Sequence, residues 1–387
     1  MAFAVAIVLT LIAASSSPAS SKSAAGCYES IVSFGDSLAD TGNYPLLCPA
    51  DSPPRYVRLP YGRTFFHHPT GRCSDGRLVI DFIAQSLGLP LVQPYIAGGE
   101  GGRSFTEGVN FAVTGATALD YDYYEKIGII NTYTNVSLGT QLDWFKQFLA
   151  TIPDGRKYLQ KSLVLMGEIG GNDYNHPIMQ RSSFQVVQSF APLVIDYIGS
   201  IIEELIRLGA ETLLVPGNLP IGCLPIYLTE FKSSSSGQDY DPQTGCLNWL
   251  NDFAIYHNEL LQKELNRIRQ LYPHVVLIYA DYYNAAMRIY LAPKQFGFSE
   301  EEILRACCGS GGPYNYNETA PCAIPPASSC HDPASYANWD GIHLTEAAYR
   351  VIAQALLQGP YTTPQFTTLC RPFNSSLITN INACSNL

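Results

Sequence analysis

The chain has 387 residues, with 23 Lys and Arg against 33 Asp and Glu, which gives a formal charge of −10. A surface of this sign repels phosphate backbones, so nucleic acid is not expected as a partner. Hydrophobic residues make up 47% of the chain and charged residues 14%, a composition that folds around a core and argues against long disorder. Neutral sugars, small esters and lipids stay open as ligands.

The chain begins with an apolar segment, residues 1–14, that has no charged side chain, and small polar residues follow it. This segment is too short to span a bilayer and has the length of a signal-peptide core. Ser23 and Ala25 form a small-x-small cleavage pattern. We therefore expect residues 1–25 to be a signal peptide and residues 26–387 to form one domain; a buried N-terminal helix is the alternative. No later segment is expected to span a membrane.

Eleven cysteines agree with export, because an oxidising compartment would pair them into at most five disulfides with one thiol remaining. Zinc is the alternative, since Cys307, Cys308, Cys322, Cys330 and His331 lie close together in the sequence. Zinc ligation usually begins from a Cys-x-x-Cys pair, and none occurs in this region. Disulfides are therefore favoured, and no metal site is expected.

Three sequons, at Asn135, Asn317 and Asn374, are candidate glycosylation sites in a chain that enters a secretory pathway. Together with the leader and the cysteines, they predict a secreted glycoprotein of the extracellular space or cell wall. The vacuole is the other destination that fits.

Short β-branched segments alternate along the chain with longer segments of helical periodicity. Strands are expected at residues 30–34, 109–113, 163–166, 212–215 and 275–279. Helices are expected at residues 77–87, around 142–149, 198–208, 249–271 and 345–357. This order predicts an α/β fold with a central parallel five-stranded sheet that helices cover on both faces. Residues 315–334, rich in Pro and Cys, look like a disulfide-stapled insertion.

Ser37 follows the first expected strand, in the segment Gly35-Asp36-Ser37-Leu38. In open parallel sheets, reactive groups gather beyond the carboxyl ends of the strands. A serine in a tight turn at that position projects its hydroxyl from the sheet. The alternative is a helix N-cap, a position that Ser and Asp also favour.

Asp340 and His343 stand immediately before the last expected helix. A nucleophilic hydroxyl needs a base that works near neutral pH, and imidazole is the side chain that titrates there. The imidazole in turn needs a carboxylate that holds one ring nitrogen protonated and aims the other at the serine. The alternative is an Asp cap beside an exposed His.

Gly115 and Asn172 end the second and third expected strands. A backbone N–H without a neighbouring Cβ and a side-chain amide are donors that suit the oxyanion formed when a hydroxyl attacks an ester. Both residues also favour plain turns, and Gly108 is a second candidate for the glycine.

Four segments are similar to the sequence blocks of the GDSL esterase/lipases of plants, a branch of the SGNH-hydrolase superfamily. The segments are Phe-Gly-Asp-Ser-Leu-Ala-Asp-Thr-Gly-Asn at 34–43, Asn-Phe-Ala-Val-Thr-Gly-Ala-Thr at 110–117, Gly-Glu-Ile-Gly-Gly-Asn-Asp-Tyr at 167–174 and Trp-Asp-Gly-Ile-His-Leu-Thr-Glu at 339–346. Residues 69–77 and 306–314 resemble further plant-type stretches. The resemblance implies Ser37 as nucleophile, Asp340 and His343 as carboxylate and base, and an oxyanion hole of the Ser37 N–H, Gly115 and Asn172.

The resemblance further implies a flavodoxin-like three-layer α/β/α sandwich without a metal or organic cofactor. The expected activity is that of a serine carboxylesterase acting through an acyl-serine intermediate. We expect the substrate to be a small-molecule or polysaccharide ester with a short acyl group such as acetyl, on a plant metabolite or cell-wall polysaccharide. A long-chain lipase, an acyltransferase that uses the same acyl-serine and a non-catalytic wall-binding protein are the alternatives.

Overall fold

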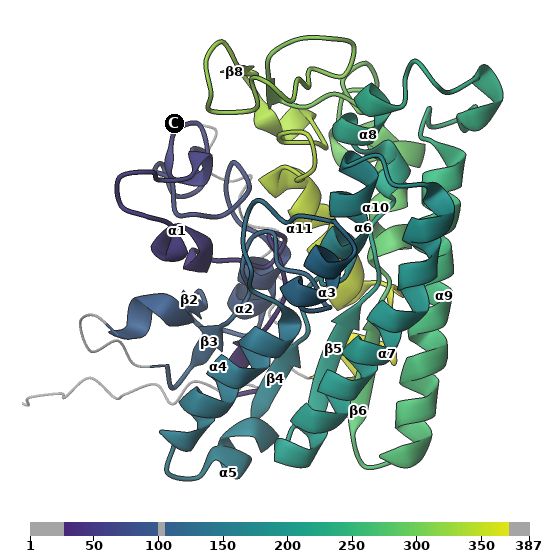
Figure 1. The fold of residues 1–387 in the computed structure, drawn as a ribbon. Coiled ribbons are helices and arrows are strands. Elements are labelled where there is room, and N and C mark those ends of the chain that lie inside the picture. The colour runs from purple at the N-terminus through teal and green to yellow at the C-terminus, as the bar shows by residue number, and fades with distance from the viewer. Residues whose placement is uncertain (1–26, 100–104, 371–387) are drawn as a thin grey trace, which may run out of the picture.

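The computed structural model describes residues 27–99 and 105–370, in which a seven-stranded sheet lies between two layers of helices (Figure 1). The expected signal peptide, residues 1–25, and the sequon at Asn374 lie outside the described residues. The spatial order of the strands is β2-β3-β1-β4-β5-β6-β9. Their bounds are β1 (Ser30–Ser33), β2 (Gln93–Pro94), β3 (Gly108–Asn110), β4 (Ser162–Leu165), β5 (Thr212–Pro216), β6 (Val276–Ala280) and β9 (Thr362–Thr363). A separate antiparallel pair consists of β7 (Cys308–Gly309) and β8 (Ser328–Ser329).

The five strands expected from the sequence form the centre of the sheet and run parallel. Numbered along the chain, these five lie in the order 2-1-3-4-5, which is the flavodoxin-like order. The expected sheet of five strands is too small, however, because β2 extends one edge and β9 pairs antiparallel at the other. Each added strand has two residues, too few to leave a period-2 pattern in the sequence.

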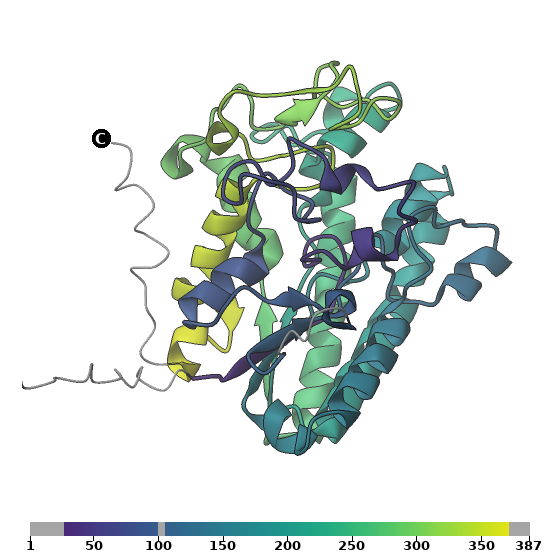
Figure 2. The same cartoon turned by 90° about the vertical axis from the view of Figure 1, so that its left-hand side faces the viewer.

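Helices cover both faces of the sheet, which Figure 2 shows from the side. On one face α7 packs against α4, α6 and α9, and on the other α11 packs against α2 and α10. The helices are α1 (Asn43–Leu47), α2 (Val79–Ser86), α3 (Tyr121–Lys126), α4 (Leu138–Ala150), α5 (Gly155–Gln160), α6 (Gly171–Met179), α7 (Phe184–Leu208), α8 (Pro225–Glu230), α9 (Asn248–Leu271), α10 (Tyr282–Leu291), α11 (Glu346–Gln358) and α12 (Phe366–Leu369).

The helix α7 is the one described helix that is long and apolar enough to cross a membrane by length and composition alone. Half of its apolar window is buried inside the fold, where Val194, Ile198 and Ile202 belong to the core. Its apolar stripe therefore serves the packing between the sheet and the neighbouring helices, as in other core helices.

The central strands are buried on both faces, which explains their continuous apolar sequences. Ile31 and Val32 of β1 and Leu163 and Val164 of β4 have no exposed surface. Burial of these side chains fixes the register of the strands. The loops that follow the strands therefore begin at fixed positions relative to one another.

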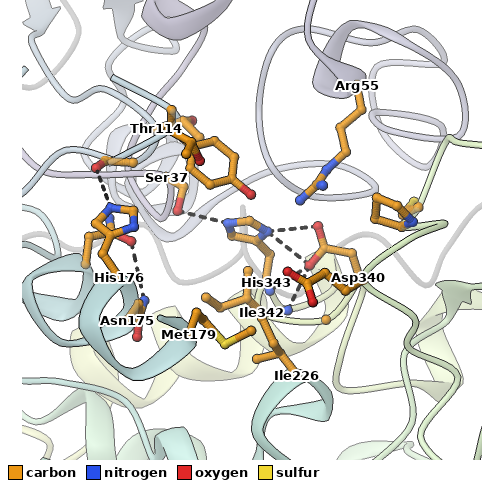
Figure 3. A pocket seen from close by; sticks show the side chains of 18 of the residues that line it. Ser37, Arg55, Thr114, Asn175, His176, Met179, Ile226, Asp340, Ile342 and His343 are labelled. Carbon is orange, nitrogen blue, oxygen red and sulfur yellow. Dashed lines mark hydrogen bonds and ion pairs between the residues drawn. The ribbon is translucent and has the colours of Figure 1, made fainter. Parts of the chain in front are cut away.

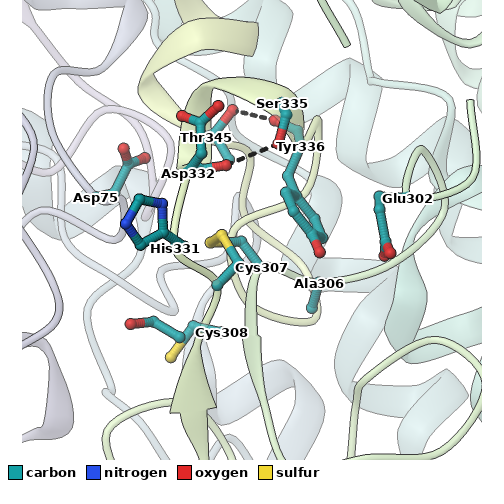
Figure 4. The surroundings of a disulfide bond; sticks show 12 residues. Asp75, Glu302, Ala306, Cys307, Cys308, His331, Asp332, Ser335, Tyr336 and Thr345 are labelled. Carbon is teal, nitrogen blue, oxygen red and sulfur yellow. Dashed lines mark hydrogen bonds between the residues drawn. A yellow bond between two sulfur atoms is a disulfide. The ribbon is translucent and has the colours of Figure 1, made fainter. Parts of the chain in front are cut away.

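Four disulfides are present in the described residues: Cys27–Cys370, Cys223–Cys246, Cys307–Cys330 and Cys308–Cys322. The zinc alternative is therefore wrong for Cys307, Cys308, Cys322 and Cys330, because their sulfur atoms are bonded to one another. Figure 4 shows Cys307 with its bonded sulfur, and next to it Cys308, the first residue of β7. Cys48 and Cys73 are unpaired, and Cys384 lies outside the described residues. The stapled insertion expected at 315–334 is confirmed.

Loss of the Cys308–Cys322 disulfide is expected to lower the free energy of unfolding. The bond closes a loop with a sequence separation of 14, for which chain entropy predicts a contribution of about 3 kcal/mol. Urea denaturation of Cys308→Ser/Cys322→Ser against the wild type measures the loss. The control is Cys48→Ser, which removes a sulfur that forms no disulfide. An unchanged denaturation midpoint in the double variant contradicts the prediction.

Candidate active site

Three of the expected site residues lie at the carboxyl ends of three adjacent strands. Ser37 follows β1, Gly115 follows β3 and Asn172 follows β4 at the start of α6. Because β1 lies between β3 and β4, the strand order reverses at this point, where α/β sheets form their binding crevice. All three residues line one cavity.

The turn after β1 needs glycine because it lies directly against the turn after β4. Gly35 has φ +132°, and a Cβ on it would lie 2.9 Å from the backbone oxygen of Glu168. Gln141 of α4 holds the turn from the other side, donating to the Gly35 oxygen at 2.8 Å and accepting from its N–H at 2.9 Å. These contacts fix where the hydroxyl of Ser37 leaves the sheet.

Ser37, His343 and Asp340 form one chain of close polar contacts across the cavity, as Figure 3 shows. The Nε2 atom of His343 lies 2.9 Å from Ser37 Oγ. The Nδ1 atom of His343 lies 2.9 Å from Asp340 Oδ2 and 3.0 Å from Oδ1. All three side chains are more than nine-tenths buried. The arrangement suits transfer of the serine proton to the imidazole while the carboxylate holds the ring.

The carboxylate of Asp340 is held ionised by its surroundings. Its oxygens accept hydrogen bonds from the N–H groups of Ile342 and His343 and from the hydroxyl of Tyr61 at 2.7 Å. Burial alone would raise the pKa of Asp340. The charge of His343, its hydrogen bond and the guanidinium of Arg55 outweigh burial and lower that pKa well below its ordinary value.

The candidate oxyanion donors converge on the cavity beside Ser37. The N–H groups of Ser37 and Gly115 have no hydrogen-bond acceptor within the described part of the chain. The Asn172 amide donates to Ala116 O at 3.0 Å and to Asp36 Oδ2 at 3.2 Å. Gly108, the other candidate glycine, packs against the backbone of Ile31 inside the sheet and does not line the cavity.

Asp36 and Glu168 form a buried carboxyl pair behind these donors. Burial, then the charge of Glu168 and a hydrogen bond with it, raises the pKa of Asp36 well above its ordinary value. Burial also raises the pKa of Glu168. Two adjacent buried carboxyls cannot both ionise cheaply. A negative charge is therefore disfavoured on Asp36, whose Oδ2 atom accepts from the Asn172 amide.

The loops of the site are joined by carboxylates that accept hydrogen bonds from backbone N–H groups of other loops. Asp40, after β1, accepts from Gly42 and Asn43 in its own turn and from Thr114 N after β3. Asp173, after β4, accepts from Ala118 N at 2.7 Å, and burial raises its pKa to about 6. Each of the two acids therefore joins a loop that follows one strand to a loop that follows another.

The stretch 69–77 supports the loop that carries His343. Ser74 donates to Leu344 O at 3.2 Å, and Asp75 accepts from Glu346 N at 2.7 Å. Arg77 forms a buried ion pair with Glu346 at 2.7 Å. The helix expected at 77–87 begins after Arg77, at Val79 of α2.

The stretch 306–314 supports the same loop from another side. Cys307 N donates to Asn338 O and Cys308 N to Trp339 O, at 2.9 and 2.7 Å. Trp339 N in turn donates to His343 O at 2.8 Å. Two segments that sequence reasoning left without a role thus hold Asp340 and His343 in place.

The cavity that contains these groups has a volume of about 460 Å³. Side chains from α6 and from the loop at 130–134 form one wall, and the stapled insertion supplies Tyr316, Glu318 and Pro321. Aromatic and apolar groups alternate with amides and with the cation of Arg55. A volume of this order suits a small ligand.

The remaining candidate residues lie away from the cavity. Asn135 and Asn317 are exposed, which attachment of a glycan requires. Tyr124 of α3 donates to Asp173 and packs on Phe190.

Sequence reasoning missed Arg55, Tyr61 and the role of Asp36 and Glu168. Arg55 and Tyr61 lie in a long irregular segment between α1 and α2, where no periodicity marks them. Asp36 and Glu168 stand inside the recognised blocks. Their places beside the candidate nucleophile and near the candidate oxyanion donor are the signal that could have found them.

Comparison with known proteins agrees with this geometry. The family described as GDSL-like lipase/acylhydrolase matches residues 31–356. The chain belongs to this family. A GDSL esterase/lipase of Arabidopsis thaliana is 52% identical over 347 residues, which are 89% of this chain and 87% of that protein. A sinapine esterase of Brassica napus is 50% identical over 366 residues, 93% of this chain and 92% of that protein.

These relatives are named as an esterase/lipase and an esterase, and the chain is accordingly a carboxylic ester hydrolase. Among solved structures, a mutant acetyl-xylooligosaccharide esterase from Geobacillus is 10% identical and covers 86% of this chain and 94% of its own, with a TM-score of 0.39. A likeness that distant carries no argument about this chain.

Asp340→Asn is expected to destabilise the fold in a pH-dependent way. Because the folded-state pKa of Asp340 is depressed, its carboxylate contributes stability above the unfolded pKa of about 3.9 and loses it as the pH falls. The difference in free energy of unfolding between wild type and variant should therefore narrow from about pH 6 to about pH 3. Urea denaturation across this range measures it, with the exposed Asp122→Asn as control. A constant difference contradicts the prediction.

Proposed function

We propose that the protein hydrolyses small esters through an acyl-enzyme formed on Ser37. His343 takes the proton of the Ser37 hydroxyl as the oxygen attacks the ester carbonyl, and Asp340 stabilises the resulting imidazolium. His343 then protonates the departing alcohol. Water attacks the acyl-serine in the second half of the reaction, with His343 again as base. The hydrogen-bonded chain at 2.9 Å between each pair of partners is the observation that carries this proposal.

The oxyanion would be bound by the Ser37 N–H, the Gly115 N–H and the amide of Asn172. The two backbone donors have no other acceptor in the described residues, and the amide is already oriented by Ala116 and Asp36. Donors positioned before the reaction lower its barrier because they need not reorient as charge develops. Burial and the neighbouring Glu168 raise the pKa of Asp36, which disfavours a negative charge that would compete with the oxyanion for the amide.

A short acyl group on a small alcohol or a polysaccharide is the substrate class that this cavity suits. Its volume of about 460 Å³ and its mixed polar and aromatic lining are those of a small-molecule site. The sinapine esterase at 50% identity is a relative whose name refers to a plant ester. A plant metabolite or cell-wall polysaccharide ester, such as an acetyl ester, fits both observations.

The site of action that we propose is outside the cell, in the cell wall, or in the vacuole. Four disulfides in the described residues suit an oxidising compartment. The apolar leader at 1–14 and the exposed sequons at Asn135 and Asn317 support the same route.

Ser37→Ala should lower kcat on 4-nitrophenyl acetate by about 10³-fold or more, because it removes the attacking oxygen. Ser189→Ala, which removes an exposed hydroxyl on α7, is the matched control and should retain full turnover. A serine-directed phosphonate should label wild type but not Ser37→Ala. Undiminished turnover in Ser37→Ala would refute the proposed nucleophile, and failure to label the wild type would favour a non-catalytic role.

The acyl preference can be read from 4-nitrophenyl esters of increasing chain length. The value of kcat/KM should fall at least about tenfold from acetate or butyrate to palmitate, because a long chain cannot be enclosed by the cavity. A rising value would instead favour the long-chain lipase. Acylated alcohol in excess of free acid, with an alcohol acceptor present, would favour the acyltransferase.

A further inference from the structure

We propose that Arg55 forms a subsite for a carboxylate on the alcohol portion of the ester substrate. The proposal rests on the proposed function, since it concerns the same cavity and the same ester. It adds a charge preference that neither the family nor the catalytic groups determine.

Arg55 belongs to the short helix η1 (Arg55–Val57) and lines the cavity together with Ser37 and His343. Figure 3 shows its guanidinium pointing into the cavity, beside the pair of His343 and Asp340. Its Nη2 atom donates to the hydroxyl of Tyr56 at 3.0 Å, and the guanidinium lies 4.9 Å from the Tyr56 ring centroid. The buried Nε atom has no hydrogen-bond partner among the described residues. A guanidinium has five N–H groups, so most of its donors are free.

The deeply buried arginines Arg72 and Arg77 are paired with carboxylates, unlike the half-buried Arg55. Arg72 binds Asp81 with two donors, at 2.8 and 2.9 Å, and Arg77 pairs with Glu346. No carboxylate in residues 27–99 and 105–370 forms an ion pair with Arg55. A cation that is partly removed from water without a counter-charge is costly, and a carboxylate supplied by the substrate would remove that cost.

No described acid near Arg55 forms a direct ion pair with it, although the charges of Arg55 and Asp340 attract one another. Asp340 already accepts from Tyr61, from His343 and from two backbone N–H groups. Glu318 lines the same cavity but forms no ion pair with Arg55. The forked guanidinium therefore faces the cavity with donors that match the two oxygens of a carboxylate.

The position of Arg55 assigns the carboxylate to the alcohol portion. In Figure 3 Arg55 lies on the Asp340 side of His343, whereas Asn175 and His176 lie on the other side, beyond Ser37. His343 hands its proton to the departing alcohol from Nε2, so the alcohol portion lies on the His343 side of Ser37. Arg55 enters the cavity from this same side of Ser37. Local recognition matters here because the chain's charge of −10 repels anions at a distance.

The test compares 4-acetoxybenzoate with its neutral methyl ester, which carries the same acetyl group on the same ring. Arg55→Met should lower the ratio of their kcat/KM values, anionic over neutral, by about tenfold. The ratio cancels any effect of Arg55 on Asp340, because both esters use the same triad. Arg55→Lys should restore part of the ratio, since a point charge remains without the fork. Arg58→Met, which removes an exposed cation three residues away, should leave it unchanged.

A binding measurement without turnover separates this proposal from the proposed function. Calorimetry on Ser37→Ala should show about tenfold weaker binding of 4-hydroxybenzoate when Arg55→Met is added. An unchanged kcat/KM ratio together with unchanged affinity overturns the Arg55 subsite while leaving ester hydrolysis intact. If neither ester is hydrolysed by the wild type, the proposed function fails, and the affinity difference alone then decides for or against the subsite.

Discussion

The hydrogen bond between Ser37 and His343 joins residues that are 306 positions apart, and no strand pairing connects their two loops directly. Each residue that is ordered loses conformational entropy. A contact between residues so far apart in the sequence is therefore stable only if other interactions already order both loops. The sheet orders the loop that carries Ser37, through β1 and the close approach of the turns after β1 and β4. Side-chain hydrogen bonds from the stretch 69–77 and backbone hydrogen bonds from the stretch 306–314 order the loop that carries His343. Geometry at the reacting atoms is thus a property of the whole scaffold.

Buried carboxyl groups around the site differ in their ionisation although they lie in one small region. Asp340 is surrounded by donors and cations, which lower its pKa, whereas burial and a neighbouring acid raise the pKa of Asp36. Environments that shift the pKa values of two acids in opposite directions allow one acid to act as an anion while the other is favoured in its protonated form. Asp340 orients the imidazole, and Asp36 accepts from the Asn172 amide at a place where a negative charge is disfavoured, beside the proposed oxyanion donors.

Much of this arrangement could be predicted from the sequence, and the omissions have physical causes. The central strands and long helices leave apolar patterns because they face the core on a regular period, and Ser37, Gly115, Asn172, Asp340 and His343 stand in short blocks next to those elements. The edge strands β2 and β9 are too short to leave such a pattern. Arg55 and Tyr61 lie in an irregular segment whose path depends on contacts with distant residues. Disulfide partners likewise depend on spatial proximity that the linear spacing of cysteines does not encode.

The disulfide between Cys27 and Cys370 has a sequence separation of 343 and therefore encloses nearly every described residue in one covalent ring. A single peptide-bond cleavage inside that ring, for example in the polar loop at 232–245, leaves both fragments attached to each other. The fragment with Ser37 and the fragment with His343 would then stay paired by a bond as well as by packing. Where proteases are abundant, the chain can therefore be cleaved once inside the ring while the disulfide keeps the two fragments in one molecule.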